Sequence, residues 1–107
     1  MAKASFWQRG ESLDYKNGTG AVIEANTVID LTTRIGVAGT TINPGEVGSL
    51  HVTGVYQLPK TGKTEIAMGA AVTFDGTGIT TGSGTPAGYA AATAAASDTV
   101  ILVKLLG

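Results

Sequence analysis

Turn-forming residues recur along the whole chain, in clusters most of which are separated by about 10–13 residues. Each cluster is rich in glycine, proline, asparagine, aspartate or serine, which supply the backbone conformations that tight turns need. The clusters lie at residues 17–20, 43–45, 59–62, 75–78, 82–86 and 97–98. Because the segments between them are short, this spacing predicts a mostly-β chain that forms a single small β-sandwich, jelly-roll-like or barrel-like domain.

The predicted strands are the short apolar or alternating runs between these turns. They cover residues 12–16, 21–24, 27–31, 34–38, 48–58, 69–74, 79–81 and 99–106. In the run 48–58 the even-numbered residues, from Leu50 to Leu58, are predicted to share one face of a single strand. Gly54 in its middle indicates a bulge, a bend or a close backbone approach. The runs 69–74 and 79–81 are predicted to form a hairpin around the turn at 75–78.

Two segments near the C-terminus have more than one interpretation. Residues 87–96 are rich in alanine, which favours helix, but ten residues form only a marginal helix and Gly88 weakens it further. We therefore expect a strand followed by a loop. The run 99–106 is apolar on both faces around Lys104, which indicates either a central strand or a strand covered by a partner.

The chain shows no internal repeat and no linker in its sequence. We expect an N-terminal arm of residues 1–10 followed by one β domain of residues 11–107. Only 14% of the residues are charged, which is low for a globular domain. This composition fits two interpretations equally: a rigid β protein with a weakly charged surface, or a protein whose surface is partly covered by a partner.

Charge and cysteine content exclude several classes of protein. The net charge of −1 provides no basic field that would hold nucleic acid. Because the chain has no cysteine, disulfide frameworks and thiolate chemistry are impossible. No apolar run approaches the length of about 18 residues that crosses a membrane, and the N-terminus lacks the apolar core of a signal peptide. We expect synthesis in a cytoplasm, with no membrane or nucleic-acid partner.

The residue types needed for catalysis are present but not in productive patterns. The one histidine, His51, lies two residues from Ser49 in a predicted strand, and no nucleophile elbow surrounds the serine. Residues 62–64 resemble the end of a phosphate-binding loop, but Gln57 stands where that loop needs its first glycine. The eight acidic residues are scattered along the chain. We therefore predict no catalytic, cofactor-binding or metal-binding residues, no cofactor, and no enzymatic activity.

The first ten residues carry a group of side chains typical of protein interfaces. Phe6 and the single tryptophan, Trp7, lie between Lys3 and Arg9. Tryptophan and arginine are the residue types most enriched among interface anchors. We predict that Lys3, Phe6, Trp7 and Arg9 contact a partner; the alternative is that Trp7 packs on its own domain.

Several stretches of the chain, in order, resemble the capsid cement or decoration proteins of tailed phages. These stretches are residues 13–20, 36–38, 42–48, 52–60, 69–75, 87–90 and 97–105, and the most specific is Val52-Thr53-Gly54-Val55-Tyr56-Gln57-Leu58-Pro59-Lys60. The chain departs from the family pattern at Phe74, where many relatives have tryptophan, and in the arm before Glu11, which varies among such proteins. The resemblance implies a β-rich, jelly-roll-like or barrel-like fold without cofactor or catalysis.

The resemblance also implies a partner and a place. A protein of this family is expected to bind the outer surface of a phage capsid and to stabilise the shell by bridging subunits of the major capsid protein. We expect it to be made in the host cytoplasm, to reside on the exterior of the virion, and to associate with itself as a homodimer in preference to a homotrimer. The alternatives are a carbohydrate-binding or adhesion module, another structural component of the phage head or tail, and a small hydrolase that uses His51.

Overall fold

The computed structural model describes residues 1–106, so Gly107 of the predicted β domain lies outside the described residues. All regular secondary structure in this range is β-strand, with no helix among the described residues. The strands are β1 (Ser12–Lys16), β2 (Val28–Asp30), β3 (Ile35–Ala38), β4 (Val47–His51), β5 (Val55–Pro59), β6 (Ala71–Phe74), β7 (Ile79–Thr80), β8 (Thr85–Ala90) and β9 (Val100–Leu105). The prediction of a small mostly-β protein is confirmed.

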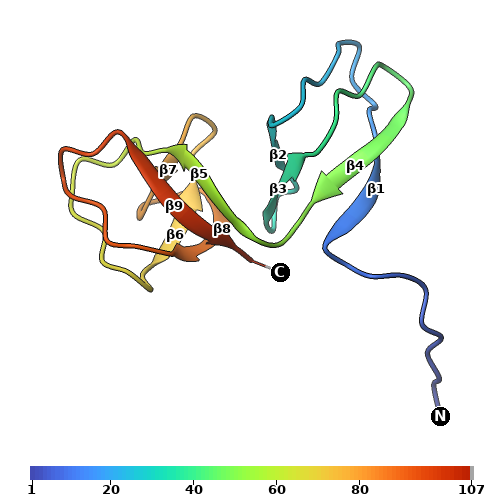
Figure 1. Ribbon diagram of the computed structural model, residues 1–107, viewed down its shortest axis with the longest axis horizontal. Coiled ribbons are helices and arrows are strands. Elements are labelled where there is room, and N and C mark those ends of the chain that lie inside the picture. The colour runs from blue at the N-terminus through green and yellow to red at the C-terminus, as the bar shows by residue number, and fades with distance from the viewer. Residues whose placement is uncertain (107) are drawn as a thin grey trace.

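The strands form two antiparallel sheets that lie side by side (Figure 1). The first has the order β1-β4-β3-β2 and the second the order β5-β9-β8-β6-β7. Residues 52–54 connect them, between β4 and β5. We call residues 11–52 the N-terminal unit and residues 54–106 the C-terminal unit.

The two units have the same topology. Strands β1, β2, β3 and β4 occupy the same positions in the first sheet as β5, β6, β8 and β9 in the second. The register also matches, because Ser12 pairs with His51 in one unit as Val55 pairs with Lys104 in the other. The structure therefore contains an internal repeat, and the expectation of no repeat was wrong at the level of structure.

Matching hydrogen bonds join the loops of each unit. An isolated bridge pairs Ile23 with Ile42 in the first unit and Ile66 with Ala94 in the second. In the loops beside these bridges, the backbone N–H groups of Ala25 and Met68 donate to Thr41 and Thr93, and those of Asn43 and Ala95 donate to the carboxylates of Glu46 and Asp98. The repeat is hidden in the sequence because equivalent core positions hold side chains of different size. One example is Ile42 of the first unit, which corresponds to Ala94 of the second.

The units differ at the connection that follows β2 and β6. In the N-terminal unit a short turn at residues 31–34 leads directly into β3, closed by a hydrogen bond from the Leu31 N–H to the Arg34 carbonyl. In the C-terminal unit the chain adds the extra strand β7, which pairs with β6 before β8 begins. The predicted hairpin around residues 75–78 is confirmed, and it is an insertion into the repeated topology.

The hydrophobic core is unequally shared. The larger cluster contains buried residues from the C-terminal unit together with Ile35 and Val37 of β3, and Val28 packs against it. Thr85 of β8 also donates a hydrogen bond to the Asp30 carboxylate, with the oxygens 2.8 Å apart. The smaller cluster consists of Ile23, Ala38 and Ile42. The outward side of β2 and β3 is therefore covered by the second unit.

Two predicted strands were wrong in detail. The run 48–58 is broken into β4 and β5 in different sheets, so its even-numbered residues do not share one face of a single strand. Gly54 has a φ of 114°, which glycine adopts at little cost, and this turns the chain from one sheet to the next. Residues 21–24 form only the bridge at Ile23, because the Asn17 side-chain amide, instead of a neighbouring strand, donates to the Ala21 carbonyl.

The two C-terminal predictions are confirmed. Residues 85–90 form β8 and the following residues form a loop, so the alanine-rich segment is a strand followed by a loop. Strand β9 is central in its sheet, between β5 and β8. Its inward residues Ile101, Val103 and Leu105 are buried, while Val100 and Leu102 on the other face are exposed.

Candidate binding surfaces

The arm extends away from both sheets as an irregular segment (Figure 1). Residues 1–9 have no regular secondary structure, and every one of them is exposed. The Phe6 and Trp7 side chains are 87% and 89% exposed, so Trp7 does not pack on either β unit. The structure thus places Lys3, Phe6, Trp7 and Arg9 on one accessible segment that leads into β1.

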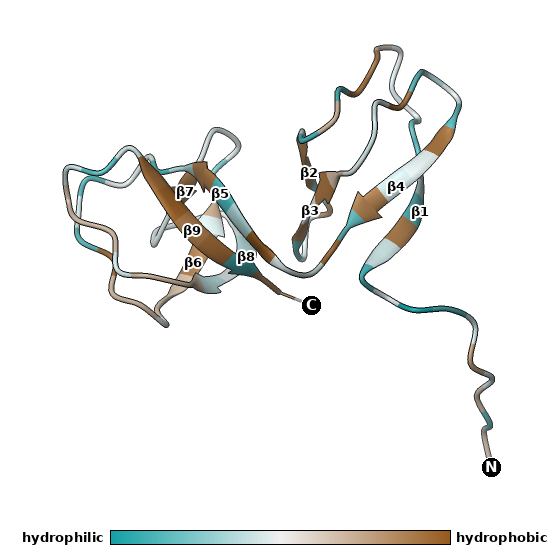
Figure 2. Ribbon diagram, in the orientation of Figure 1, coloured by the Kyte–Doolittle hydropathy of each residue, from teal (hydrophilic) through white to brown (hydrophobic). Residues whose placement is uncertain are grey.

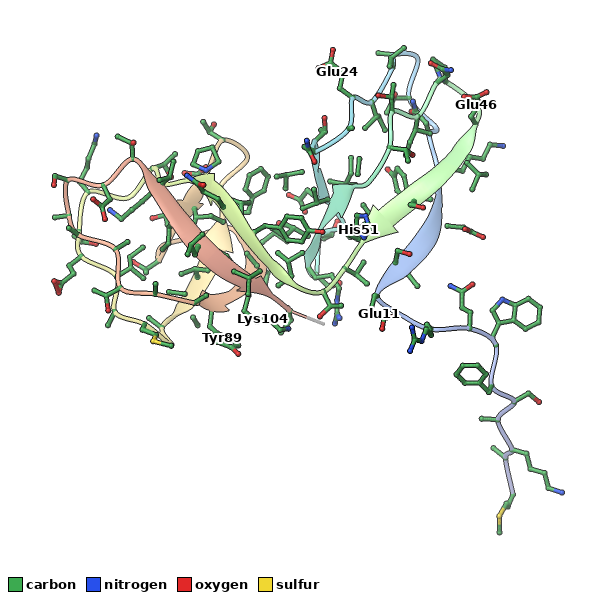
Figure 3. All side chains as sticks on the ribbon, viewed as in Figure 1. Glu11, Glu24, Glu46, His51, Tyr89 and Lys104 are labelled. Carbon is green, nitrogen blue, oxygen red and sulfur yellow. The ribbon has the colours of Figure 1, made fainter. Side chains whose placement is uncertain are left out.

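A second exposed apolar surface lies on the C-terminal unit. Val55, Tyr89, Val100 and Leu102 are between 43% and 55% exposed. Leu102 pairs across strands with Gln57, and Lys104 pairs with both Val55 and Tyr89, so these side chains are neighbours on one face. We call the surface made by Val55, Gln57, Tyr89, Val100, Leu102 and Lys104 the outer face. Figure 2 shows hydrophobic colour along most of β9, and in Figure 3 the labelled Tyr89 and Lys104 lie next to each other.

A hollow of about 320 Å³ opens on this face. Its lining comes from Gln57, from Asp98, and from β9 residues that include Val100 and Leu102, together with the loop residues 92–94. This volume lies at the lower end of the range for small-molecule pockets, and it suits one inserted side chain better than a cofactor. The hollow therefore adds a recess with a partly apolar lining to the outer face.

His51 has a packing role in the structure. It ends β4 with its ring centroid 6.5 Å from that of Tyr56, at the junction of the two units. The ring also covers Gly39, where even a methyl group would collide with the imidazole. Ser49 lies two residues away on the same face of β4. The interpretation of His51 as an ordinary sheet-face histidine is favoured over the hydrolase.

Four of the eight acidic residues, Asp30, Glu46, Asp75 and Asp98, accept hydrogen bonds within turns, loops or the contact between the units. Among residues 1–106 no three His, Asp or Glu side chains come together in a way that would hold a metal ion. Asp75 accepts hydrogen bonds from the Thr61 hydroxyl at 2.7 Å and from the N–H groups of Thr77 and Gly78. These bonds, chiefly that of Thr61, lower the pKa of Asp75 below its ordinary value. Asp75 thus stabilises the hairpin turn.

The segment 62–64 is a loop between β5 and β6. It leads through the Ile66 bridge into β6, whereas a phosphate-binding loop opens a helix whose N-terminus holds the phosphate. The neighbouring Lys60 directs its ammonium to the carbonyls of Gly62 and Ala96. Sequence reasoning did not single out Val55 or Tyr89 of the outer face, because their exposure depends on which sheet β5 joins.

These features define a class of protein: a β-rich structural protein with exposed apolar contact surfaces. A family model described as phage cement protein matches residues 7–105. The chain belongs to the phage cement protein family, and its role is that of a structural component of a phage capsid. No curated protein and no solved structure shows significant similarity to it. Within residues 1–106 there is no helix that is long and apolar enough to cross a membrane.

Proposed function

We propose that this protein binds the outer surface of a phage capsid and stabilises the shell by bridging subunits of the major capsid protein. The observation that carries the proposal is the match of nearly the whole chain to the phage cement family, combined with an arm whose Phe6 and Trp7 side chains are almost fully exposed. The arm of residues 1–10 then acts as a contact element beside a β domain of residues 11–107.

The arm offers both kinds of binding energy that an interface uses. Burial of Phe6 and Trp7 would remove two large apolar surfaces from water, and each aromatic side chain buries about 150–250 Å². Lys3 and Arg9 flank them with positive charge that suits carboxylates on the capsid surface. An extended ten-residue arm reaches about 33 Å, so it can contact a capsid subunit other than the one beneath the β units.

The two β units suit a load-bearing bridge. They are joined through a shared apolar cluster, and isolated bridges hold the longer loops of each unit together. Contacts by the arm and by the β units with different subunits would act together, because the second contact of a tethered molecule is effectively intramolecular. Each contact can then be smaller than a standard interface of about 800 Å² per partner and still give slow release.

The remaining parts of the proposal concern assembly and place. The protein associates with itself as a homodimer, is made in the host cytoplasm and resides on the virion exterior, without nucleic acid, membrane or cofactor as partner. It has no catalytic activity. The low net charge and scattered acidic residues support this view, as does the packing role of His51.

The carbohydrate-binding alternative would need a platform of exposed aromatic side chains. The exposed aromatics of the described chain are Phe6 and Trp7 on the arm and Tyr89 on the outer face, and they do not form one platform. We therefore rank capsid binding above an adhesion module.

Co-sedimentation with cement-free, expanded shells of the parent phage tests the proposal. We expect wild-type protein to saturate the shells at a fixed ratio to the capsid subunits and to raise the temperature at which they disrupt. Phe6→Ala with Trp7→Ala should weaken binding at least about tenfold, as expected for interface anchors. The control is Val22→Ser, which removes an exposed apolar side chain from a loop of the N-terminal unit.

Absence of binding to shells of either maturation state would contradict the proposal. Binding of the wild-type protein together with an unchanged affinity of the arm variant would keep the cement role and remove the arm from it. Binding to a glycan array instead of shells would favour the adhesion module.

A further inference from the structure

The outer faces of the two units differ in chemistry at equivalent positions. The matching strand register aligns Ser12 with Val55, Asp14 with Gln57, Lys16 with Pro59, and Ser49 with Leu102. In the N-terminal unit these positions are polar, as expected for a sheet face in contact with water. In the C-terminal unit the same face is mostly apolar, and Val55 and Leu102 remain 55% and 43% exposed.

The backbone does not account for this difference, since both units have the same strand order and pairing. A sheet that faces water on one side normally alternates apolar and polar residues, as β1 does with Ser12, Asp14 and Lys16 on its outward face. Contiguous exposed apolar side chains on a small soluble protein mark an interaction site. The outer face of the C-terminal unit therefore has the composition of a face that is covered in the assembled state.

The molecule itself shows what covers this face of a unit. One row of paired residues crosses the N-terminal sheet on its outward side, from Ser12 through His51 and Val37 to Val28. Its apolar end, Val37 and Val28, packs on the cluster of the C-terminal unit. The equivalent row of the second sheet runs from Val55 through Lys104 and Tyr89 to Ala71, and nothing in the described chain covers it. Within the molecule, the outward side of one unit is thus buried against the apolar cluster of another unit of the same topology.

We propose that the outer face of the C-terminal unit is the seam at which two copies of this chain form a two-fold dimer. The proposal deepens the self-association in the proposed function by assigning it to these residues. In a two-fold interface the same patch of both copies meets, so the patch must be complementary to itself. A face with four exposed apolar side chains and few charges meets that requirement.

The charges of the face also support a two-fold arrangement. Asp98 precedes β9 and Lys104 lies near its other end, about 20 Å away for six residues of strand. With the axis at the level of Ile101 in the middle of β9, the Asp98 carboxylate of one copy faces the Lys104 ammonium of the other. Lys104 donates to the Leu105 carbonyl at 2.8 Å and to the Thr53 hydroxyl at 3.3 Å, which leaves one of its three N–H groups for an external acceptor. The hollow beside Leu102 provides a recess for a side chain of the second copy.

Replacement of the apolar residues by those of the other unit tests the seam. In Val55→Ser with Leu102→Ser, each position receives the residue that the equivalent position of the N-terminal unit already holds. We expect the wild-type protein to sediment as a dimer and the double variant to dissociate with a Kd raised at least about tenfold. The matched control is Val22→Ser with Val47→Ser, because Val47 occupies the position equivalent to Val100 and is 60% exposed. Thermal unfolding of each variant shows that the fold is retained.

A charge exchange tests the two-fold geometry independently. Lys104→Glu should weaken the dimer, since it places two carboxylates opposite each other, and Asp98→Lys combined with Lys104→Glu should restore it. Three results would each overturn the proposal. The wild-type protein could be monomeric, the double serine variant could dimerise as well as wild type, or the charge exchange could fail to restore association. Co-sedimentation of the double serine variant with shells tests the cement role separately. A wild-type protein that does not dimerise but still binds shells would contradict the seam and leave the cement role intact.

Discussion

The two units reach the same topology with different means of stabilisation. The C-terminal unit is built around a cluster of thirteen buried residues, two of which come from β3 of the other unit, whereas the N-terminal unit has a separate cluster of three. Where the first unit buries Asn17, the second buries Lys60, and both side chains bond to loop carbonyls. The comparison teaches that the strand order and the loop hydrogen bonds are repeated in both units, while apolar burial is concentrated in one of them.

The largest effect is expected at Gly88 of β8, and the equivalent glycine, Gly36 of β3, provides the comparison. A Cβ at Gly88 would collide with the Lys104 carbonyl of the neighbouring strand, and its φ of 136° disfavours other residues. Gly88→Ala should lower the free energy of unfolding by about 3 kcal/mol or more. A Cβ at Gly36 would meet the Leu50 side chain at 2.7 Å, and a side chain can move aside, so Gly36→Ala should cost about 1–2 kcal/mol. Urea unfolding measures the free energy of unfolding of both variants. Equal losses of stability in Gly88→Ala and Gly36→Ala would contradict the comparison.

The next effect concerns the isoleucines that form the loop bridges. Ile66 is 2% exposed and belongs to the large cluster, while Ile23 is 9% exposed and belongs to the small one. Ile66→Ala should lower the free energy of unfolding by about 3–4 kcal/mol and Ile23→Ala by about 2 kcal/mol, because fewer neighbours surround the cavity in the first unit. A larger loss for Ile23 in the same denaturation assay would show that the N-terminal unit limits stability.

Smaller effects are expected at the buried polar pair. The Asn17 amide donates to Ala21 and Ile42 at 2.8 and 2.9 Å, and its oxygen accepts from the Thr19 N–H at 2.9 Å. Asn17→Ala should therefore cost about 2 kcal/mol, through unsatisfied carbonyl and N–H groups. Lys60→Met keeps a buried apolar chain of similar length and should lower the free energy of unfolding by about 1 kcal/mol. Hydrogen exchange of the flanking loops would show whether each loss stays within its own unit.

The smallest effect is expected at Asp75, in the hairpin that the N-terminal unit lacks. Its pKa is lowered in the folded protein, so its ionised form stabilises the fold above the unfolded pKa near 3.8, and this contribution is lost as the pH falls through the lower folded value. Asp75→Asn should reduce stability slightly near pH 7. The difference from wild type should shrink as the pH is lowered to about 3. Glu24→Gln, on an exposed turn of the N-terminal unit, is the control.

The sequence predicted most strands because their alternation and flanking turns are local features. Strand β1, the β6–β7 hairpin, β8 and β9 all lie where the apolar runs and glycine clusters indicated. The break at residues 52–54 was not predicted, since a mid-strand glycine is compatible with a bulge as well as with a change of sheet. The repeat escaped because Tyr15 and Ile42 correspond to Leu58 and Ala94, and a core accepts such exchanges if the total volume is filled.

The binding surfaces were predictable to different degrees. The arm residues Phe6 and Trp7 stand out in the sequence by type and by their flanking charges, and the structure leaves them exposed. The outer face was only suggested by the apolar last strand. Its extent depends on β5 and β8 pairing on either side of β9, and such long-range pairings are not encoded by local pattern.

An image reconstruction of saturated shells by cryo-electron microscopy tests the central claim most directly. The account predicts density for this protein on the outer capsid surface, with the arm and the β units of one chain, or the two chains of one dimer, contacting different capsid subunits. Density in which every copy contacts a single capsid subunit, or no ordered density on the outer surface, would contradict the bridging role.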